Sequence, residues 1–130
     1  MPSFWKHVNK VIKEADIIIE VLDARMVEET RNFEVEDKVK KEEKILLYVF
    51  NKCDLASKEK LKTIKHSLKP SVFISSRDKL GTTILKKKIM ELSKGNPTVV
   101  GILGYPNVGK SSLINALSGK GSAKTSSESG

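Results

Sequence analysis

A loop with two glycines and a lysine is the strongest candidate for binding chemistry in this sequence. Residues 104–111 read GYPNVGKS, which fits the pattern Gly-x4-Gly-Lys-Ser/Thr. The loop follows the apolar run TVVGIL and precedes the helix-like segment SSLINALSG. Glycines let such a loop turn tightly, so that successive backbone N–H groups point at phosphate oxygens, and the helix that follows adds a favourable dipole. The loop therefore predicts a site for the phosphates of a nucleotide.

Individual positions of this loop have predicted roles. Lys110 would reach the terminal phosphates and is the candidate catalytic residue, and Ser111 would give its hydroxyl to Mg²⁺. The predicted nucleotide-contacting residues of the loop are Gly104, Asn107, Val108, Gly109, Lys110, Ser111 and Ser112. The alternative is a glycine-rich turn between a strand and a helix that binds nothing.

A second candidate site lies upstream, where the apolar run ILLYVF ends in NKCD, residues 51–54. The Asp54 carboxylate can accept two parallel hydrogen bonds from the ring N–H and the exocyclic amine of guanine, a pattern that adenine does not offer. The stem of Lys52 would lie along the base, and Asn51 would brace the loop. The alternative is that Asn51 and Asp54 only cap a helix that starts near Ser57.

Four short apolar runs are the candidate strands that position these loops. They cover residues 16–22, 45–50, 71–75 and 98–104, and each is too continuous for a strand with one wet face. Between them lie segments rich in Lys, Glu and Leu with apolar residues at helical spacing. The expected helices cover residues 1–16, 31–44, 57–69 and 81–95. This alternation predicts an α/β fold with a mostly parallel sheet and helices on both faces.

The chain divides into two unequal parts. Residues 1–118 contain no repeat and no boundary, so they predict one domain. Residues 119–130, GKGSAKTSSESG, are small and polar, and no apolar side chain there is larger than that of Ala. This tail is expected to be a flexible loop that contributes no core element.

The composition of the chain indicates which kinds of partner it could bind and in which cellular compartment it functions. Lys and Arg number 24 against 16 Asp and Glu, a formal charge of +8 that favours a polyanionic partner such as RNA, although dispersed lysines are also typical of a solvated surface. The single cysteine excludes an internal disulfide and fits a reducing cytoplasmic compartment. No apolar run approaches the roughly 20 residues that span a membrane. These features predict a cytoplasmic protein without a membrane partner.

The order of the motifs resembles one family of GTPases. In ordinary small GTPases the phosphate loop comes first, whereas here N-K-x-D precedes it. This order resembles that of the circularly permuted GTPases associated with ribosome assembly, and the segment from Asp23, Ala24 and Arg25 to Arg31 and Asn32 is similar to the "DAR…RN" segment of that family. The resemblance implies a circularly permuted three-layer P-loop NTPase fold that binds GTP and GDP with Mg²⁺. Read from the residues alone, Asp23 and Arg25 are a strand-end pair that could tie a loop.

The resemblance also implies further contacts and partners. Ser75, Ser76 and Arg77 would form the turn whose backbone N–H contacts the guanine carbonyl. Asn107 would help to hold a K⁺ ion. The family's role implies ribosomal RNA or a ribosomal subunit as partner, bound by a monomer.

Two parts of the GTPase machinery are not found after the phosphate loop. No D-x-x-G motif and no convincing switch threonine follow it, and Thr125 lies too early for that role. The resemblance therefore implies a domain cut short before D-x-x-G, with an incomplete sheet and hydrolysis assigned to the complete protein. The alternative is a non-hydrolytic RNA-binding module gated by a guanine nucleotide. A protein that uses ATP is disfavoured, because both NKCD (residues 51–54) and ISSR (residues 74–77) would then match guanine-binding motifs by chance.

Overall fold

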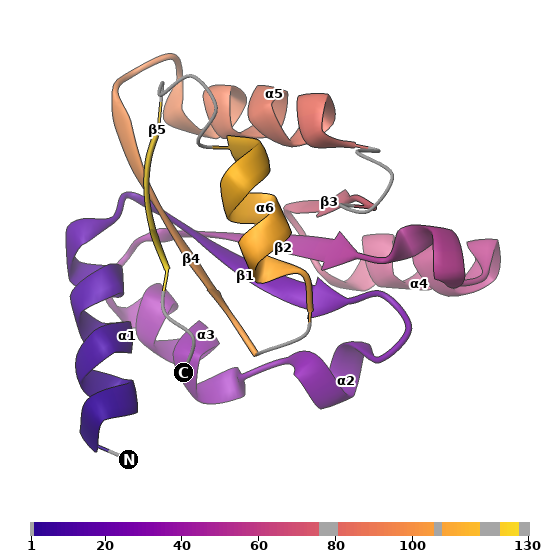
Figure 1. The fold of residues 1–130 in the computed structure, drawn as a ribbon, viewed down its shortest axis with the longest axis horizontal. Helices are drawn as coiled ribbons and strands as arrows, with labels where there is room; N and C mark the ends of the chain where they lie inside the picture. Colours follow the sequence, from indigo (N-terminus) through magenta and orange to yellow (C-terminus); the bar gives the residue numbers. More distant parts are fainter. Residues whose placement is uncertain (1, 76–80, 106–107, 118–122, 128–130) are drawn as a thin grey trace.

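The computed structural model describes residues 2–75, 81–105, 108–117 and 123–127 (Figure 1). Helices and strands alternate along most of the chain. In order they are α1 (Pro2–Glu14), β1 (Ile17–Asp23), α2 (Val27–Thr30), α3 (Phe33–Lys41), β2 (Ile45–Asn51), the 3-10 turn η1 (Cys53–Leu55), α4 (Lys58–Ser67), β3 (Ser71–Phe73), α5 (Thr82–Ser93), β4 (Thr98–Gly104), α6 (Lys110–Leu117) and β5 (Ala123–Ser127).

The strands form one parallel sheet in the order β3-β2-β1-β4-β5. The central strand β1 pairs on one side with β2, where Asp23 lies opposite Asn51, and on the other with β4, where Val21 lies opposite Gly104. Because all pairs are parallel, the strands end at the same edge of the sheet. This edge is where ligands bind in open α/β sheets.

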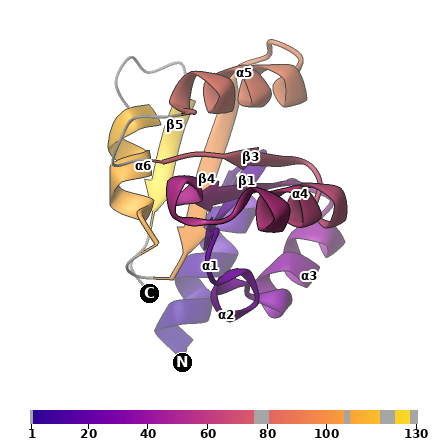
Figure 2. The same ribbon diagram turned by 90° about the vertical axis from the view of Figure 1, so that its right-hand side faces the viewer.

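The sheet is buried on both faces, as the apolar runs predict. All seven residues of β1 are buried, because they alternate between two cores. Ile18 and Leu22 belong to the core under α1, α3 and α4, and Ile19 and Val21 belong to the core under α5 and α6. Figure 2 shows α5 above the strands and α1, α2 and α3 below them. The α/β prediction with helices on both faces is confirmed.

Most helix predictions are also confirmed. Ser57 caps α4, because its side chain accepts a hydrogen bond from Lys60 N at 3.1 Å. The fourth predicted helix, α5, ends at Ser93, and the left-handed conformations of Lys94 and Gly95 turn the chain away. The short helix α2 was not predicted. None of the described helices combines the length and the apolar character that a bilayer-spanning segment needs.

The prediction of a loop without regular structure after residue 118 is wrong for residues 123–127. They form β5, which pairs with β4 from Thr98 opposite Ala123 to Ile102 opposite Ser127. A strand ladder is made by backbone groups, so small polar residues can pair with an apolar strand whose outer N–H and C=O groups need partners. The edge of β4 that the sequence left exposed is therefore covered in the structure.

Gly101 is where α1 packs against the sheet. A Cβ atom there would lie 2.5 Å from Val11 Cγ1 and 3.1 Å from Ala15 Cβ, and both of these residues are buried. Glycine at this position therefore allows the helix to lie directly on β4.

We expect Gly101→Ala to lower the free energy of unfolding by about 1–3 kcal/mol, because the added methyl group overpacks this contact. Urea denaturation measures the loss. The double variant Val11→Ala/Gly101→Ala should cost less than the sum of the two single variants, since it removes the clashing methyl groups. Additive costs would contradict the steric explanation.

Candidate functional site

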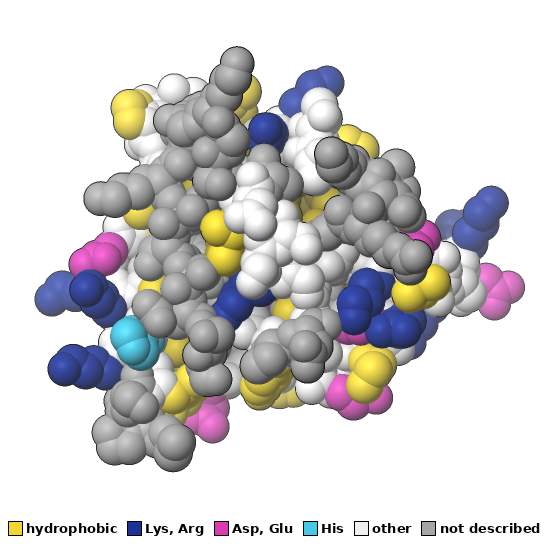
Figure 3. All heavy atoms as spheres, viewed as in Figure 1, with side chains coloured by type: hydrophobic (Ala, Val, Ile, Leu, Met, Phe, Trp, Pro, Cys, Tyr) yellow, Lys and Arg dark blue, Asp and Glu magenta, His cyan; other side chains and the backbone are white. Residues whose placement is uncertain are grey.

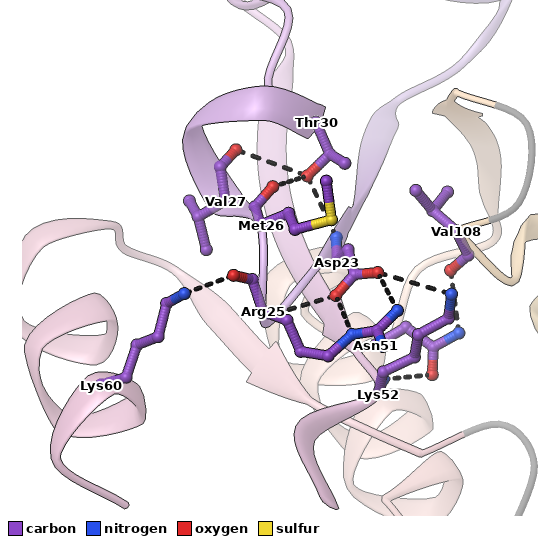
Figure 4. A network of polar contacts seen from close by, with 9 residues as sticks. All are labelled: Asp23, Arg25, Met26, Val27, Thr30, Asn51, Lys52, Lys60 and Val108. Carbon is purple, nitrogen blue, oxygen red and sulfur yellow. Dashed lines mark hydrogen bonds and ion pairs between the residues drawn. The ribbon is translucent and has the colours of Figure 1, made fainter. Parts of the chain in front are cut away.

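Polar residues gather where three neighbouring strands end. Asp23 ends β1, Asn51 ends β2 and Gly104 ends β4, and the backbone of Ala24 donates to Asn51 O at 2.8 Å. The sheet thus brings N-K-x-D next to the phosphate-loop motif, although 49 residues separate Asp54 from Gly104. Figure 4 shows Asp23, Asn51, Lys52 and Val108 close together at this edge.

Asn51 joins the two loops. Its Nδ2 donates to the carbonyl oxygen of Val108 at 2.9 Å, and its Oδ1 accepts from Lys52 N at 2.8 Å. Asn51 is buried, so these bonds are shielded from competing water. It therefore braces its own loop against the phosphate loop, while the cap of α4 comes from Ser57.

The rest of the NKCD segment turns outward. Lys52 has φ +61° and leaves the strand in the left-handed region, which is uncommon for a residue with a side chain. The turn η1 follows, with Asp54 exposed, and Cys53 N donates to Ile74 O at 3.1 Å. The exposed Asp54 carboxylate is thus presented to solvent at the strand ends, on a loop fixed at both sides.

Asp23 is the buried anion of this edge. Its Oδ1 accepts from Arg25 N at 2.8 Å and Arg25 Nε at 3.1 Å, and its Oδ2 accepts from Arg25 Nη2 at 2.9 Å. Lys52 Nζ lies 3.4 Å from the same Oδ2. Burial acts to raise the pKa of Asp23, but the Arg25 hydrogen bonds and the charges of Arg25 and Lys52 outweigh it and lower the pKa to about 2. The residue-based interpretation of Asp23 and Arg25 as a pair that ties a loop is confirmed.

The described part of the phosphate loop is tightly packed. A Cβ atom at Gly104 would lie 3.0 Å from Val21 O and 3.3 Å from Val108 Cγ2. Gly109 has φ +89°, a conformation that glycine adopts without strain. Lys110, the first residue of α6, is largely buried, and its Nζ lies 3.5 Å from the Gly104 carbonyl oxygen. The lysine therefore lies back along the loop that precedes it.

The other predicted site residues are only partly described. Ser75 is buried directly beyond β3, and Ser111 and Ser112 are exposed in the first turn of α6. Ser76, Arg77 and Asn107 lie outside the described residues. Among the described residues, no group of three or more His, Cys, Asp or Glu could hold a metal by itself. An exposed serine hydroxyl at the start of α6 instead fits a hard cation such as Mg²⁺ that is held mainly by phosphate oxygens.

A second polar cluster, not predicted from the sequence, is buried behind the edge. Glu20 of β1 accepts at Oε2 from Asn32 N at 2.9 Å. Glu36 of α3 accepts from Arg31 Nε at 3.0 Å, from Arg31 Nη2 at 2.6 Å and from Tyr48 Oη at 3.3 Å. The sequence feature that could have indicated this cluster is the glutamate inside the apolar run DIIIEVL, because both faces of that strand are buried. Arg31 and Asn32, from the RN part of the "DAR…RN" segment, thus hold buried carboxyl groups.

Glu20 and Glu36 differ in protonation. Burial raises the pKa of Glu20 to about 9, and a hydrogen bond to Glu36 and the charge of Glu36 add to this rise. Burial also acts to raise the pKa of Glu36, but hydrogen bonds from Arg31 and Glu20 outweigh it and lower that pKa. Glu20 Oε1 is buried and has no hydrogen-bond partner among the described residues, which disfavours a charged carboxylate there. These directions predict that the pair holds one proton at neutral pH, on Glu20.

We expect Glu20→Gln to become more stable than the native sequence as pH rises. The folded pKa of about 9 lies above the ordinary 4.5, so the stability from protonated Glu20 is complete below about pH 4.5 and is lost as pH rises through about 9. Glutamine keeps both hydrogen bonds without titrating, which predicts an advantage on the order of 1–3 kcal/mol at pH 7 and little below pH 4.5.

Urea denaturation at several pH values tests this difference. Glu34→Gln, an exposed change on the same helix as Glu36, is the matched control and should follow the native sequence at every pH. Parallel stability curves for Glu20→Gln and the native chain would contradict the assignment of the proton to Glu20.

Known GTP-binding proteins are similar to this chain. Residues 99–130 match the family model described as 50S ribosome-binding GTPase. The uncharacterized GTP-binding protein MJ1464 of Methanocaldococcus jannaschii is 50% identical over 130 residues, which cover 96% of this chain and 35% of that protein. Nucleolar GTP-binding protein 2 of Eremothecium gossypii is 40% identical over 124 residues, which cover 87% of this chain and 25% of that protein. The chain thus spans between a quarter and about a third of the length of these relatives.

A solved structure shares the fold. The crystal structure of YjeQ from Thermotoga maritima matches with a TM-score of 0.60 and 26% sequence identity, over 82% of this chain and 39% of that chain. The α/β arrangement described here is therefore one that a known protein adopts.

Proposed function

We propose that this chain is the guanine nucleotide-binding part of a circularly permuted GTPase. The observation that carries the proposal is the hydrogen bond from Asn51 Nδ2 to Val108 O, because it joins a guanine-reading motif to a phosphate-loop motif in one site. Similarity to GTP-binding proteins over nearly the whole chain supports it. The permutation follows from the motif order, in which N-K-x-D precedes the phosphate loop.

The proposed nucleotide lies along the edge where the strands end. The Asp54 carboxylate accepts from the guanine ring N–H and amine, the Lys52 stem lies along the base, and the turn at Ser75, Ser76 and Arg77 offers backbone N–H groups to the guanine carbonyl. The phosphates lie on the loop from Gly104 to Gly109 and on Lys110 at the start of α6. This direction of binding follows from the positions of the two motifs at the ends of β2 and β4, the strands on either side of β1.

Two cations complete the proposed site. The Ser111 hydroxyl holds Mg²⁺ together with phosphate oxygens, which the metal prefers to a cage made of protein groups alone. Asn107 helps to hold K⁺. When bound, these ions neutralise charge on the phosphates, and the chain contributes the loop, the hydroxyl and the amide.

We assign GTP hydrolysis to the complete protein and nucleotide binding to this chain. Lys110 stabilises negative charge on the terminal phosphates, and phosphoryl transfer relies mainly on positioning and charge stabilisation. No D-x-x-G motif follows the phosphate loop in these 130 residues. We therefore expect this chain to bind GDP without full catalytic competence.

The proposed role is in ribosome assembly, with ribosomal RNA or a ribosomal subunit as partner and the chain acting as a monomer. The family description of residues 99–130 names a 50S ribosome-binding GTPase, and one relative is named as nucleolar. We expect the protein where ribosomal subunits are assembled, which is the cytoplasm in a cell without a nucleus.

A second candidate is a non-hydrolytic RNA-binding module gated by the nucleotide. Exposed lysines favour it, and Figure 3 shows Lys and Arg side chains on opposite sides of this face. Two helices, α1 and α4, carry several exposed lysines each. They are Lys6, Lys10 and Lys13 of α1 and Lys58, Lys60, Lys62 and Lys65 of α4. Measuring GTP turnover by the complete protein separates the two candidates.

Competition against a fluorescent GDP analogue tests the proposed function. Unlabelled GDP should displace the analogue from this chain, and ADP should not do so at the same concentration. Displacement by both nucleotides alike would contradict the guanine-reading role of N-K-x-D. Failure of a folded sample to bind either nucleotide would contradict the phosphate loop as well.

A further inference from the structure

We infer that Asp23 is a positioning residue for the guanine-reading loop: its buried carboxylate holds the Lys52 ammonium group in place before a nucleotide binds. The inference rests on the proposed function, because it concerns how the site recognises the base. It adds a residue from β1 that lies outside both nucleotide motifs.

Backbone contacts fix the loop to β1. Asp23 lies directly opposite Asn51 in the β1–β2 register, and one residue further Ala24 N donates to Asn51 O at 2.8 Å. Asp23 N in turn donates to Thr30 Oγ1 at 3.1 Å, which ties the strand end to α2. The start of the NKCD segment therefore has a fixed distance from the Asp23 side chain.

Two cations share the Asp23 carboxylate. Arg25 donates to both oxygens and so fixes the plane of the carboxylate, as Figure 4 shows, and Lys52 Nζ lies 3.4 Å from Oδ2. The Asp23 side chain is only 5% exposed, compared with 42% for Arg25 and 31% for Lys52. The anion therefore lies beneath both cations, where its attraction for them is screened less than between exposed groups.

This arrangement fixes both ends of the Lys52 side chain. Its backbone is held by the bond from Lys52 N to Asn51 Oδ1 at 2.8 Å, and its ammonium group is held by Asp23. The methylene groups between them form an ordered stem on which a base can pack. A lysine without this anchor would have to be ordered during binding, and ordering one such side chain weakens affinity about three- to tenfold.

The test compares two ligands that use different parts of the site. We expect Asp23→Asn to weaken GDP binding about three- to tenfold and to leave the binding of inorganic tripolyphosphate unchanged, because tripolyphosphate has no base. A purely structural role of Asp23 would weaken both ligands. Glu29→Gln, an exposed change from carboxylate to amide on α2, is the matched control and should keep both affinities.

A double-mutant cycle with Lys52→Met decides whether Asp23 acts through Lys52. Methionine keeps a stem of similar length without the charge, so Lys52→Met should lose the same three- to tenfold in GDP affinity, and Asp23→Asn should then cost nothing further. Lys52→Met also tests the anchor if Asp23→Asn does not fold. GDP affinity equal to that of the native chain in Lys52→Met, or additive losses in the cycle, would overturn the inference.

The nucleotide preference of the native chain separates failure of this inference from failure of the proposed function. If it binds GDP in preference to ADP while the Asp23→Asn and Lys52→Met variants do so equally well, only this inference fails. If the native chain shows no preference for GDP, the proposed function fails and the inference fails with it.

Discussion

Replacing Lys110 with alanine is expected to weaken GTP binding by this chain about 10- to 100-fold, the usual cost of losing charged hydrogen bonds. The ammonium group starts α6 and lies 3.5 Å from the Gly104 carbonyl oxygen, so it is already within the loop that would surround the phosphates. The loss should be larger for GTP than for GDP, because the terminal phosphates are the ones that Lys110 would reach. Competition against a fluorescent GDP analogue measures both affinities.

The control for Lys110 must remove a lysine without touching the loop. Lys87→Ala on α5 does so, since Lys87 is exposed, and both affinities should stay as in the native chain. Lys110 is largely buried, so the unfolding midpoint of Lys110→Ala has to be recorded as well. A folded Lys110→Ala variant that binds GTP as the native chain does would remove the phosphate-loop assignment.

Replacing Asp54 with asparagine is expected to weaken GDP binding about 30-fold or more while the fold stays intact. The carboxylate is exposed on η1, so its loss leaves no buried group unpaired in the free protein. In the complex, asparagine offers one acceptor and one donor where guanine presents two donors. Xanthine has a carbonyl in place of the amine, so the variant should bind xanthosine diphosphate better than the native chain does.

Three nucleotides and one control variant separate the explanations for Asp54. ADP affinity should be equally low in the native chain and in Asp54→Asn, and Glu59→Gln, an exposed change on the neighbouring helix α4, should leave GDP affinity unchanged. Unchanged GDP affinity in Asp54→Asn would remove the base-reading role. A loss of GDP affinity without a gain for xanthosine diphosphate would point to a disturbed loop.

The framework of the site could be predicted because its signals are local. Continuous apolar runs such as residues 16–22 and 45–50 predict strands covered on both sides, and Ser57 marks the start of α4. NKCD and GYPNVGKS were expected in one site because their order resembles that of the circularly permuted GTPases. The parallel sheet puts both at one edge, where Asn51 contacts Val108.

The features that escaped prediction depend on tertiary partners. Residues 123–127 have no apolar side chain larger than that of Ala to mark a strand, and they pair because β4 offers backbone groups along its edge. Glu20 is buried because Asn32 and Glu36 supply its hydrogen bonds, and those partners lie on another element. The contact between Asp23 and Lys52 could be predicted only from the strand register. Both residues lie just after apolar runs, but their types alone do not show that they contact each other.

The strand order also determines when the two halves of the site acquire their framework during folding. Ile17 of β1 pairs with Ile45 on one side and with Val100 on the other, so the second pairing closes a much longer stretch of chain. Longer loops cost more entropy to close, and contacts distant in sequence form more slowly. In a chain made from its N-terminus, β1, β2 and β3 are also available before β4. We therefore expect the NKCD loop to gain its support first, and the loop from Gly104 to Gly109 to be added to a sheet that already holds Asp23 and Asn51 at its edge.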